Sequence, residues 1–261
     1  MKGDARDLLR GLVDSLSTYK RHVEIDLIFD SQDDFLYRQK GQLKLDNTVL
    51  EEFLPYLFNL RLIPGLKRID TLTVGPQSSF AGLSFGSPFL PLDSGAVVLK
   101  LKDQDFSVAK PHQISIADDP RGRRVFEAKF FVSHFATEIK TNLDKKMFQE
   151  ASQTAAELKR AVPGSRYVLL CEFLDMTPIT TKLTSIDEVI VLRKAKRLAS
   201  NIRAEFSTVA GRRRARDEYV RYLDAHPLRY ECFERFVGHL NELFPEKEED
   251  SEDVVLDRGY F

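Results

Sequence analysis

The sequence predicts an α/β (α+β) fold, with a central sheet flanked by helices and additional helices at both ends of the chain. Segment 130–178 has the pattern strand, helix, strand. Its helix is expected over about 145–160, and the nearly unbroken apolar run 167–173 is typical of a strand buried on both faces. Asp, Pro and Gly at 118–122 each favour turns, which predicts a hairpin between two extended stretches. Apolar residues at helical spacing near both chain ends predict the additional helices.

The N-terminal region is expected to be helical and rich in loops. Helical spacing of leucines predicts an amphipathic helix over 4–22, and 23–30 fits either a short strand or a continuation of that helix. Thr48 followed by Glu51 has the pattern of a capping box, which predicts a second helix from Thr48 to about residue 60. Prolines and glycines recur between 63 and 92, so this segment is expected to be loop.

The hairpin sets which residues meet at its base. Residues 96–101 predict a strand and 106–117 a second extended stretch, in which Pro111 indicates an edge or a bend. If the turn centres between Arg121 and Gly122, Glu138 on the returning strand faces Asp105, and a slip of two residues would place Asp103 there instead.

The C-terminal region predicts one more strand, three helices and an acidic tail. The strand is expected over 186–192 and the helices over 194–203, 212–223 and 230–244, with the tail after Pro245. No composition break divides the chain sharply.

Composition excludes several classes of protein. The chain has 261 residues, of which 43% are hydrophobic, and no apolar run approaches the ~20 residues of a membrane helix. Two cysteines and an N-terminus without a signal-peptide core indicate a reducing cytoplasm. The histidines lack the spacing of a zinc site, and no nucleotide-binding glycine motif or hydrolase elbow occurs. The net charge of −1 conceals basic clusters at 121–124, 193–197 and 212–216.

Glu138 and Lys140 are the first candidates for chemistry. Alternate residues of a strand share a face, so these two side chains point the same way and Ile139 points into the core. A hard cation such as Mg²⁺ takes one or two carboxylates together with waters and substrate phosphate, so a second acid is needed near Glu138.

Asp105 is the preferred second acid, Asp103 is the reserve, and Asp119 is disfavoured. At about 3.3 Å per residue, the hairpin tip with Asp119 would lie roughly 50 Å from Glu138 in a regular hairpin. Asp144 is expected to cap the 145–160 helix. Gln149 and Glu150, near the start of that helix, are candidates for supporting the metal or touching the substrate.

An acid on one strand, Glu-x-Lys on the next, and then a helix and a buried strand resemble the core of the PD-(D/E)XK nuclease superfamily over roughly 96–195. The longer run EIKTNLDKKMFQEA, followed by TAAELK, YVLLCEFLDM and DEVIVLRK, looks like the BbvCI-like type II restriction endonucleases. No Pro-Asp dipeptide precedes the first acid, which departs from the pattern in the family's name.

The resemblance implies a mixed central sheet and a division into a helical recognition or dimer-contact region (1–95), a nuclease core (96–203) and C-terminal helices with an acidic tail (204–261). It also implies cleavage of double-stranded DNA at a specific sequence by a homodimer or a heterodimer. Asp105, Glu138 and the Ile139 carbonyl would hold Mg²⁺, and Lys140 would orient or help deprotonate the attacking water. The alternatives are a nicking or repair nuclease on the same core and a non-catalytic DNA-binding or assembly subunit.

The expected DNA contacts are basic side chains that neutralise phosphates, with sequence choice made at base edges. Gln77 and Ser78 of the 75–92 segment are further candidates. The basic candidates are Arg121, Arg123, Arg124, Arg212, Arg213 and Arg214.

Overall fold

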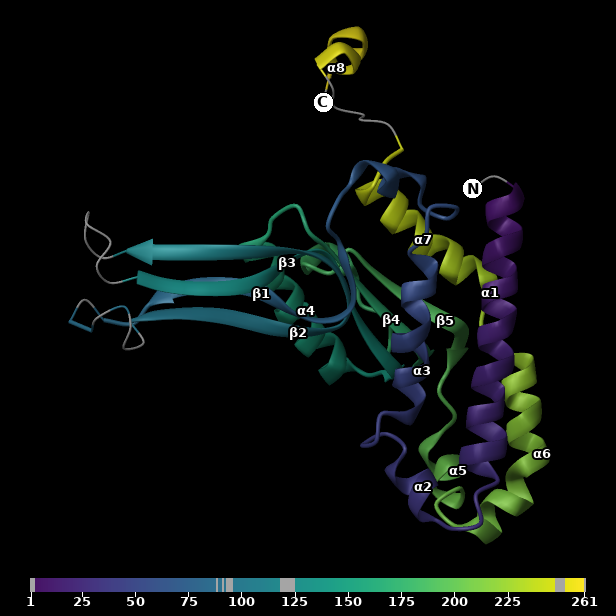
Figure 1. The fold of residues 1–261 in the computed structure, drawn as a ribbon. Coiled ribbons are helices and arrows are strands. Elements are labelled where there is room, and N and C mark those ends of the chain that lie inside the picture. Colours follow the sequence, from purple (N-terminus) through teal and green to yellow (C-terminus); the bar gives the residue numbers. More distant parts are fainter. Residues whose placement is uncertain are drawn as a thin grey trace.

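A mixed five-stranded sheet forms the centre of the computed structural model, which describes residues 3–87, 89–90, 92, 96–117, 125–246 and 252–260 (Figure 1). The strands lie in chain order, antiparallel from β1 to β3 and parallel from β3 to β5. This arrangement confirms the predicted α+β class with a mixed sheet. The strands are β1 (Thr73–Phe85), β2 (Val97–Ala117), β3 (Val125–Leu143), β4 (Arg166–Leu174) and β5 (Glu188–Lys196).

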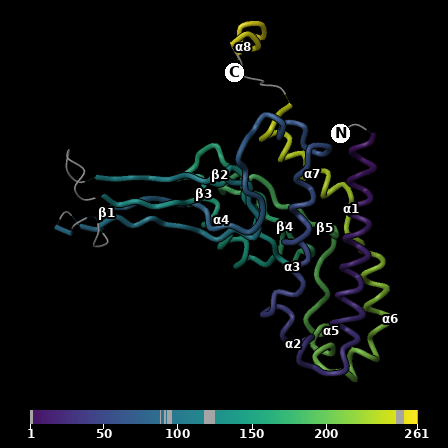
Figure 2. Tube along the Cα trace, viewed as in Figure 1, coloured from purple at the N-terminus to yellow at the C-terminus, as the bar shows by residue number. Residues whose placement is uncertain are grey.

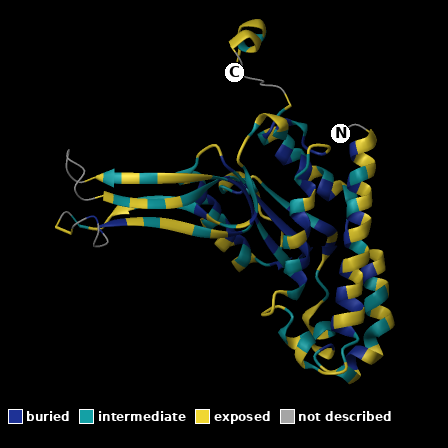
Figure 3. Ribbon diagram, in the orientation of Figure 1, coloured by how far each residue is buried: buried dark blue, intermediate teal, exposed yellow. Residues whose placement is uncertain are grey.

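The strand–helix–strand unit forms as predicted. Helix α4 (Lys145–Ala161) connects the parallel strands β3 and β4, and the Asp144 carboxylate caps it by accepting from the Met147 N–H at 2.8 Å. Alternate residues of β4 enter two different cores. Val168 and Leu170 pack in the larger core, whereas Leu169 and Cys171 pack with the buried stripe of α4. This strand is therefore buried on both faces (Figure 3).

Helices cover the face of the sheet opposite α4. Residues of α1 (Gly3–His22), α3 (Leu45–Phe53) and α7 (Tyr230–Leu243) form the larger core with the strands. The remaining helical segments are η1 (Val23–Phe29), α2 (Phe35–Gln39), η2 (Leu54–Leu57), η3 (Pro64–Arg68), η5 (Thr181–Leu183), α5 (Ser200–Glu205), α6 (Val209–Ala225) and α8 (Glu252–Arg258). None of the described helices is both long and apolar enough to cross a membrane.

Strands β1, β2 and β3 form an arm that extends beyond the helices, to the left in Figures 1 and 2. Ser79 of β1 lies opposite Lys102 of β2, and Phe131 of β3 lies opposite Pro111, yet Ser79 and Phe131 pair with each other. Strand β2 must therefore bend back on itself between Lys102 and Pro111, as the ribbon in Figure 1 shows. The buried hydroxyls of Ser79 and Ser133 bond to each other inside this arm.

Several boundary predictions are wrong. The expected loop over 63–92 contains strand β1, which tolerates Gly75, Pro76 and Gly82 because the pairing with β2 shifts register at those positions. The stretches expected over 96–101 and 106–117 are joined through 102–105 into the single strand β2. The edge expected at Pro111 is confirmed: this residue pairs with Phe131 of β3 but has no partner on β1, which pairs with β2 only as far as Ala109.

The helical boundaries also differ in places. Segment 23–30 continues α1 as a π-helix, and Thr48 lies inside α3, where its hydroxyl donates to Lys44 O at 2.8 Å, so it is no cap. Strand β5 runs to Lys196, which shortens the helix expected over 194–203 to α5. The expected acidic tail contains α8. The helices expected over 212–223 and 230–244 are present as α6 and α7.

Candidate active site

The candidate site forms where β2 stops pairing with β3. Phe106 pairs with Thr137, which is the register that places Asp105 next to Glu138. Beyond this pair, side chains replace the neighbouring strand: Asp105 Oδ2 accepts from the Ile139 N–H at 2.8 Å, and Asn47 Nδ2 donates to Ile139 O at 3.2 Å. At Ile139, the backbone N–H and C=O of β3 are therefore satisfied by two polar side chains instead of a neighbouring strand.

Glu138 and Lys140 lie together on one face of β3, and the Ile139 side chain is buried on the other. Lys140 Nζ lies 2.6 Å from Glu138 Oε1, while the hydroxyl of Tyr167 on β4 donates to Glu138 Oε2 at 2.8 Å. Both oxygens of this carboxylate are thus held in place. The pair keeps partial access to solvent, with 26% of the Lys140 side chain and 21% of the Glu138 side chain exposed.

The surroundings determine the charge of Lys140 and Tyr167. Burial lowers the pKa of Lys140, but the hydrogen bond to Glu138 and the charges of Glu138 and Asp105 outweigh burial and raise this pKa above its ordinary value. Burial, followed by the charge of Glu138, raises the pKa of Tyr167. Lys140 is therefore a cation at neutral pH, and Tyr167 remains a neutral donor.

Helix α3 brings a third carboxylate, Glu51, close to this site. Glu51 Oε1 is buried without a hydrogen-bond partner in the described part of the chain. Burial, followed by the charge of Asp105, raises the pKa of the Glu51 carboxyl. Glu51 and Asp105 line one cavity of about 490 Å³, and Lys44, at the start of α3, has its Nζ 4.0 Å from Asp105 Oδ1.

This set of residues fits a hard cation. Across the described ranges, no three His, Cys, Asp or Glu side chains converge as a complete metal cage. Mg²⁺ needs no such cage, because it is usually held by one or two carboxylates, waters and substrate phosphate oxygens. The unpartnered Glu51 Oε1 beside Asp105 is the kind of oxygen that a cation would satisfy.

The reserve residues lie near the site but are engaged elsewhere. Asp103 lines the same cavity as Asp105, but its carboxylate accepts from the Ser78 hydroxyl on β1. Glu150 is exposed on α4, with its Oε1 3.7 Å from Lys146 Nζ, and its charge contributes to the raised pKa of Lys140. Gln149 is exposed on the same helix.

The basic candidates for DNA contacts separate into three groups. Arg121, Arg123 and Arg124, like Asp119, lie outside the described residues. Arg213 and Arg214 are exposed on α6.

Arg212 is wrong as a DNA contact. Only 1% of this residue is exposed, and its guanidinium donates to the backbone carbonyls of Phe29 at 2.8 Å, Phe206 at 3.0 Å and Ser31 at 3.1 Å. Position 212 lies on the inner face of α6, and three consecutive arginines in a sequence do not reveal which of them points inward.

Four residues of the site were not found from the sequence: Asn47, Glu51, Lys44 and Tyr167. Asn47 and Glu51 are four residues apart and therefore share one face of α3. Without a known orientation, this polar stripe is indistinguishable from a solvated face. Tyr167 begins an apolar run, and its hydroxyl was the only signal that this strand end is polar.

Comparisons with known proteins identify a family. The model of the Bpu10I restriction endonuclease family matches residues 42–261. No curated protein sequence matches the chain. Among solved structures, a chain of the native BbvCI A2B2 tetramer, determined at low resolution, is similar with 20% sequence identity and a TM-score of 0.44, over 90% of this chain and 87% of that one.

Proposed function

Because this chain belongs to the Bpu10I restriction endonuclease family, we propose that it cleaves double-stranded DNA at a specific sequence with Mg²⁺, using Asp105, Glu138 and Lys140. The observation that carries this assignment is the bond from the Ile139 N–H to Asp105 Oδ2 at 2.8 Å. It joins the acid of one strand to the Glu-x-Lys segment of the next. The charges of both carboxylates, Glu138 and Asp105, act on the Lys140 ammonium.

The cation would be held by Asp105 and Glu138, with the Ile139 carbonyl and Glu51 as further oxygen donors. Ile139 O accepts from Asn47, and a carbonyl oxygen has a second lone pair. A bound Mg²⁺ supplies an acidified water and a positive charge on the phosphate oxygens. Tyr167 holds Glu138 Oε2, so this carboxylate would keep its orientation with a cation bound beside it.

Lys140 acts in its charged form. Its raised pKa favours the ammonium, which stabilises negative charge that develops on the phosphate and orients the attacking water through its N–H donors. Deprotonating the water directly would require Lys140 to leave Glu138 first. Charge stabilisation is therefore its main role.

Plasmid cleavage tests the assignment. The variants Lys140→Ala, Asp105→Asn and Glu138→Gln should each lower the cleavage rate by on the order of 10²–10³-fold, because Lys140 would stabilise the developing negative charge and the two carboxylates would hold the cation. Filter binding in Ca²⁺ should show that most DNA affinity remains. Lys146→Ala is the matched control, since Lys146 is exposed on α4 and lies outside the site. Near-wild-type cleavage by Lys140→Ala would contradict the assignment.

We further propose that the working enzyme contains at least two catalytic subunits, either two copies of this chain or this chain and a second nuclease subunit. One site per chain cuts one strand, and a double-strand break requires two cuts. With both subunits present, Mg²⁺ should convert supercoiled plasmid to the linear form. A nicked product only would favour a nicking or repair enzyme, and no product would favour a non-catalytic subunit.

The substrate would be reached in the cytoplasm of a prokaryotic cell. Both cysteines, Cys171 and Cys232, are buried free thiols, which suits a reducing compartment.

A further inference from the structure

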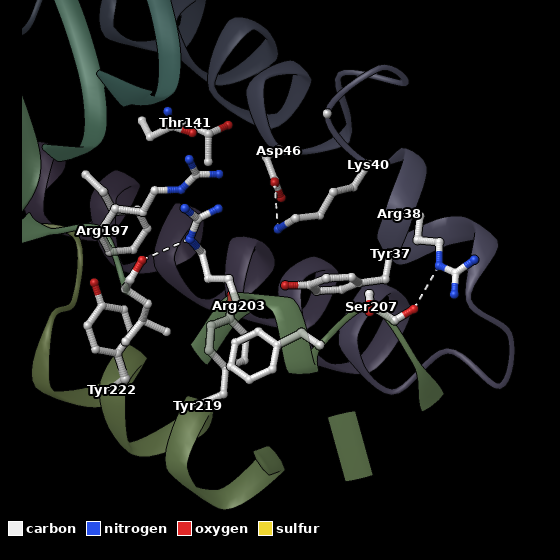
Figure 4. A pocket seen from close by; sticks show the side chains of 15 residues that line it. Tyr37, Arg38, Lys40, Asp46, Thr141, Arg197, Arg203, Ser207, Tyr219 and Tyr222 are labelled. Carbon is white, nitrogen blue, oxygen red and sulfur yellow. Dashed lines mark hydrogen bonds and ion pairs between the residues drawn. The ribbon is translucent and has the colours of Figure 1, made fainter. Parts of the chain in front are cut away.

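A second cavity, separate from the one beside Asp105, lies among α2, α5, α6 and the ends of β3 and β4. Its volume is about 410 Å³, within the range of pockets that bind small molecules. Figure 4 shows it as a space lined by aromatic rings and basic side chains. Nothing in the proposed cleavage reaction uses these residues.

The aromatic wall is rigid. Tyr219 stacks on Phe29 with ring centroids 4.4 Å apart, and Tyr222 stacks on Phe173 at 5.7 Å. Tyr37 extends this wall, with its ring centroid 5.8 Å from that of Phe29 and 6.2 Å from that of Phe206. Flat rings held by neighbouring rings offer a stacking surface to a planar ligand at little cost in conformational entropy.

Arg203 gives the pocket an uncompensated positive charge. Its Nε donates to Leu198 O at 2.9 Å, and no carboxylate of the described ranges pairs with it. Arg197 lies beside it in Figure 4 and is itself paired with Asp175 at 3.1 Å. Burial, together with the charge of Arg197, lowers the pKa of Arg203. Two neighbouring guanidinium groups with one carboxylate between them leave room for an anion.

Two phenol hydroxyls add neutral donors. Neither Tyr37 nor Tyr219 has a hydrogen-bond partner for its hydroxyl among the described residues, although both line the cavity. In Figure 4 the Tyr37 hydroxyl is directed to the side of the pocket that holds the two arginines. Lys40, by contrast, is satisfied by Asp46 at 3.0 Å.

The cavity adjoins the candidate active site along β3. Thr141, which lines it, follows Lys140 directly, and the Thr141 hydroxyl bonds to Asn47, the residue that also holds Ile139 O. Because neighbouring residues of a strand point to opposite faces, Thr141 lies on the face of β3 opposite Lys140, and the two sites approach each other only through the backbone of this strand.

We propose that this cavity binds a nucleotide, with the base among the tyrosine rings and the phosphate at Arg203 and Arg197. Stacking accepts any base, and the guanidinium groups require the phosphate. The nucleotide could be a unit of the bound DNA that leaves the base stack, which rests on the proposed function, or a free mononucleotide, which does not.

The absence of tryptophan from the chain allows a direct test. Tyr37→Trp introduces a single indole into the cavity, and Tyr56→Trp, at an exposed site outside it, is the matched control. Both are made in the Lys140→Ala background. Their fluorescence is titrated with each of the four deoxynucleoside monophosphates, with the corresponding nucleosides, and with plasmid DNA that the wild-type enzyme cleaves.

We expect saturable quenching of the Tyr37→Trp protein, and none of the Tyr56→Trp protein, by monophosphates or by plasmid. Quenching by monophosphates identifies a free-nucleotide site, and quenching by plasmid alone identifies a nucleotide of the DNA. Arg203→Gln should raise the dissociation constant of the ligand that quenches by about tenfold, because one charge-assisted contact is lost. Arg221→Gln, on the exposed side of α6, should leave it unchanged.

Equal quenching of both indoles, equal quenching by nucleosides, or no effect of Arg203→Gln would each overturn the proposal. If Tyr37→Trp does not fold, saturation-transfer NMR of the monophosphates on the unmodified chain and on Arg203→Gln replaces it, with the same outcomes. These signals require no cleavage. A failure of the nuclease assignment would appear in the plasmid assay with Lys140→Ala, and a failure of the nucleotide site would appear here.

Discussion

The ionised Glu51 carboxylate destabilises the folded chain, because it is partly buried beside the charge of Asp105, and a bound cation would remove this destabilisation. Its pKa is raised in the folded chain, so the unfolded chain loses this proton first as pH rises. The free energy of unfolding of the metal-free protein should therefore fall from about pH 4.5 upwards, until the folded group has also ionised.

Glu51→Gln should stabilise the metal-free protein at pH 7 by no more than about 1 kcal/mol, or roughly 2–4 °C in melting temperature, because the group is only partly buried. The difference should vanish below about pH 4. Added Ca²⁺ should raise the melting temperature of the wild type more than that of the variant. Glu52→Gln, the exposed neighbour on α3, is the control. Equal Ca²⁺ shifts in wild type and Glu51→Gln would remove Glu51 from the metal site.

Tyr167 is a positioning residue, since its ring is buried and its hydroxyl would act through Glu138. Tyr167→Phe removes one hydrogen bond to a charged group, a contribution of about 1.5–3 kcal/mol, so we expect a cleavage rate lower by roughly 10–100-fold. A freer Glu138 should also raise the Mg²⁺ concentration needed for half-maximal rate. Tyr230→Phe, whose hydroxyl contacts Glu234 on α7, should change neither quantity. An unchanged Mg²⁺ dependence of Tyr167→Phe would contradict this role.

Helix α6 places neighbouring arginines in opposite environments. Arg212→Ala leaves several buried carbonyls and Asp34 without their shared donor, so we expect the free energy of unfolding to fall by about 3 kcal/mol or more. Arg214→Ala, at an exposed position, should change it by less than about 0.5 kcal/mol. Urea unfolding measures both. Comparable losses for the two variants would contradict the assigned burial.

Arg214 also tests the DNA footprint, because its side chain is exposed and its replacement should leave the fold intact. If its guanidinium contacts a phosphate, Arg214→Ala should reduce the salt dependence of DNA binding by about one unit of slope. An unchanged slope in a filter-binding salt titration would exclude Arg214 from the phosphate contacts.

The elements differ in how far local sequence determines them. The register that brings Asp105 to Glu138 agrees with the expected one only because of a bulge. At the tip Ala117 pairs with Val125, one residue away from the expected partner, and the bulge between Val108 and Ala109 restores the expected register at Phe106 and Thr137. No residue type at Val108 or Ala109 indicates this bulge in the pairing of β2 with β3. Strand β1 could not be predicted, since Pro76 and the flanking glycines mark bulges in a strand as readily as they mark a loop.

The active site depends on tertiary packing that the sequence pattern does not contain. Asn47 and Glu51 matter because α3 lies against the edge of β3, and this docking is fixed by contacts between segments more than ninety residues apart. The arm has the same origin. Its bend in β2 follows from the pairing of β1 with β3 at Ser79 and Phe131, which only the folded chain brings together.

At the scale of the whole molecule, a network of buried ion pairs connects the N-terminal helices to the sheet. Lys20 of α1 has its Nζ 2.8 Å from Glu172 Oε1 on β4 and donates to Asp46 O on α3 at 2.8 Å. Arg193 of β5 bonds to Glu172 and to Glu24 of η1, each at 2.9 Å. Since α3 also carries Asn47 and Glu51, this network holds the helix that completes the active site.

Lys20→Met should therefore lower the free energy of unfolding by about 3–5 kcal/mol, because it leaves buried carboxylates with too little positive charge. Adding Glu172→Gln to it removes one of those carboxylates and should recover part of the loss, which urea unfolding of the single and double variants would measure. At temperatures where the single variant is still folded, α3 should be less firmly held, so amide hydrogen exchange in residues 45–53 should increase. Additive losses in the double variant would show that Lys20 and Glu172 act independently.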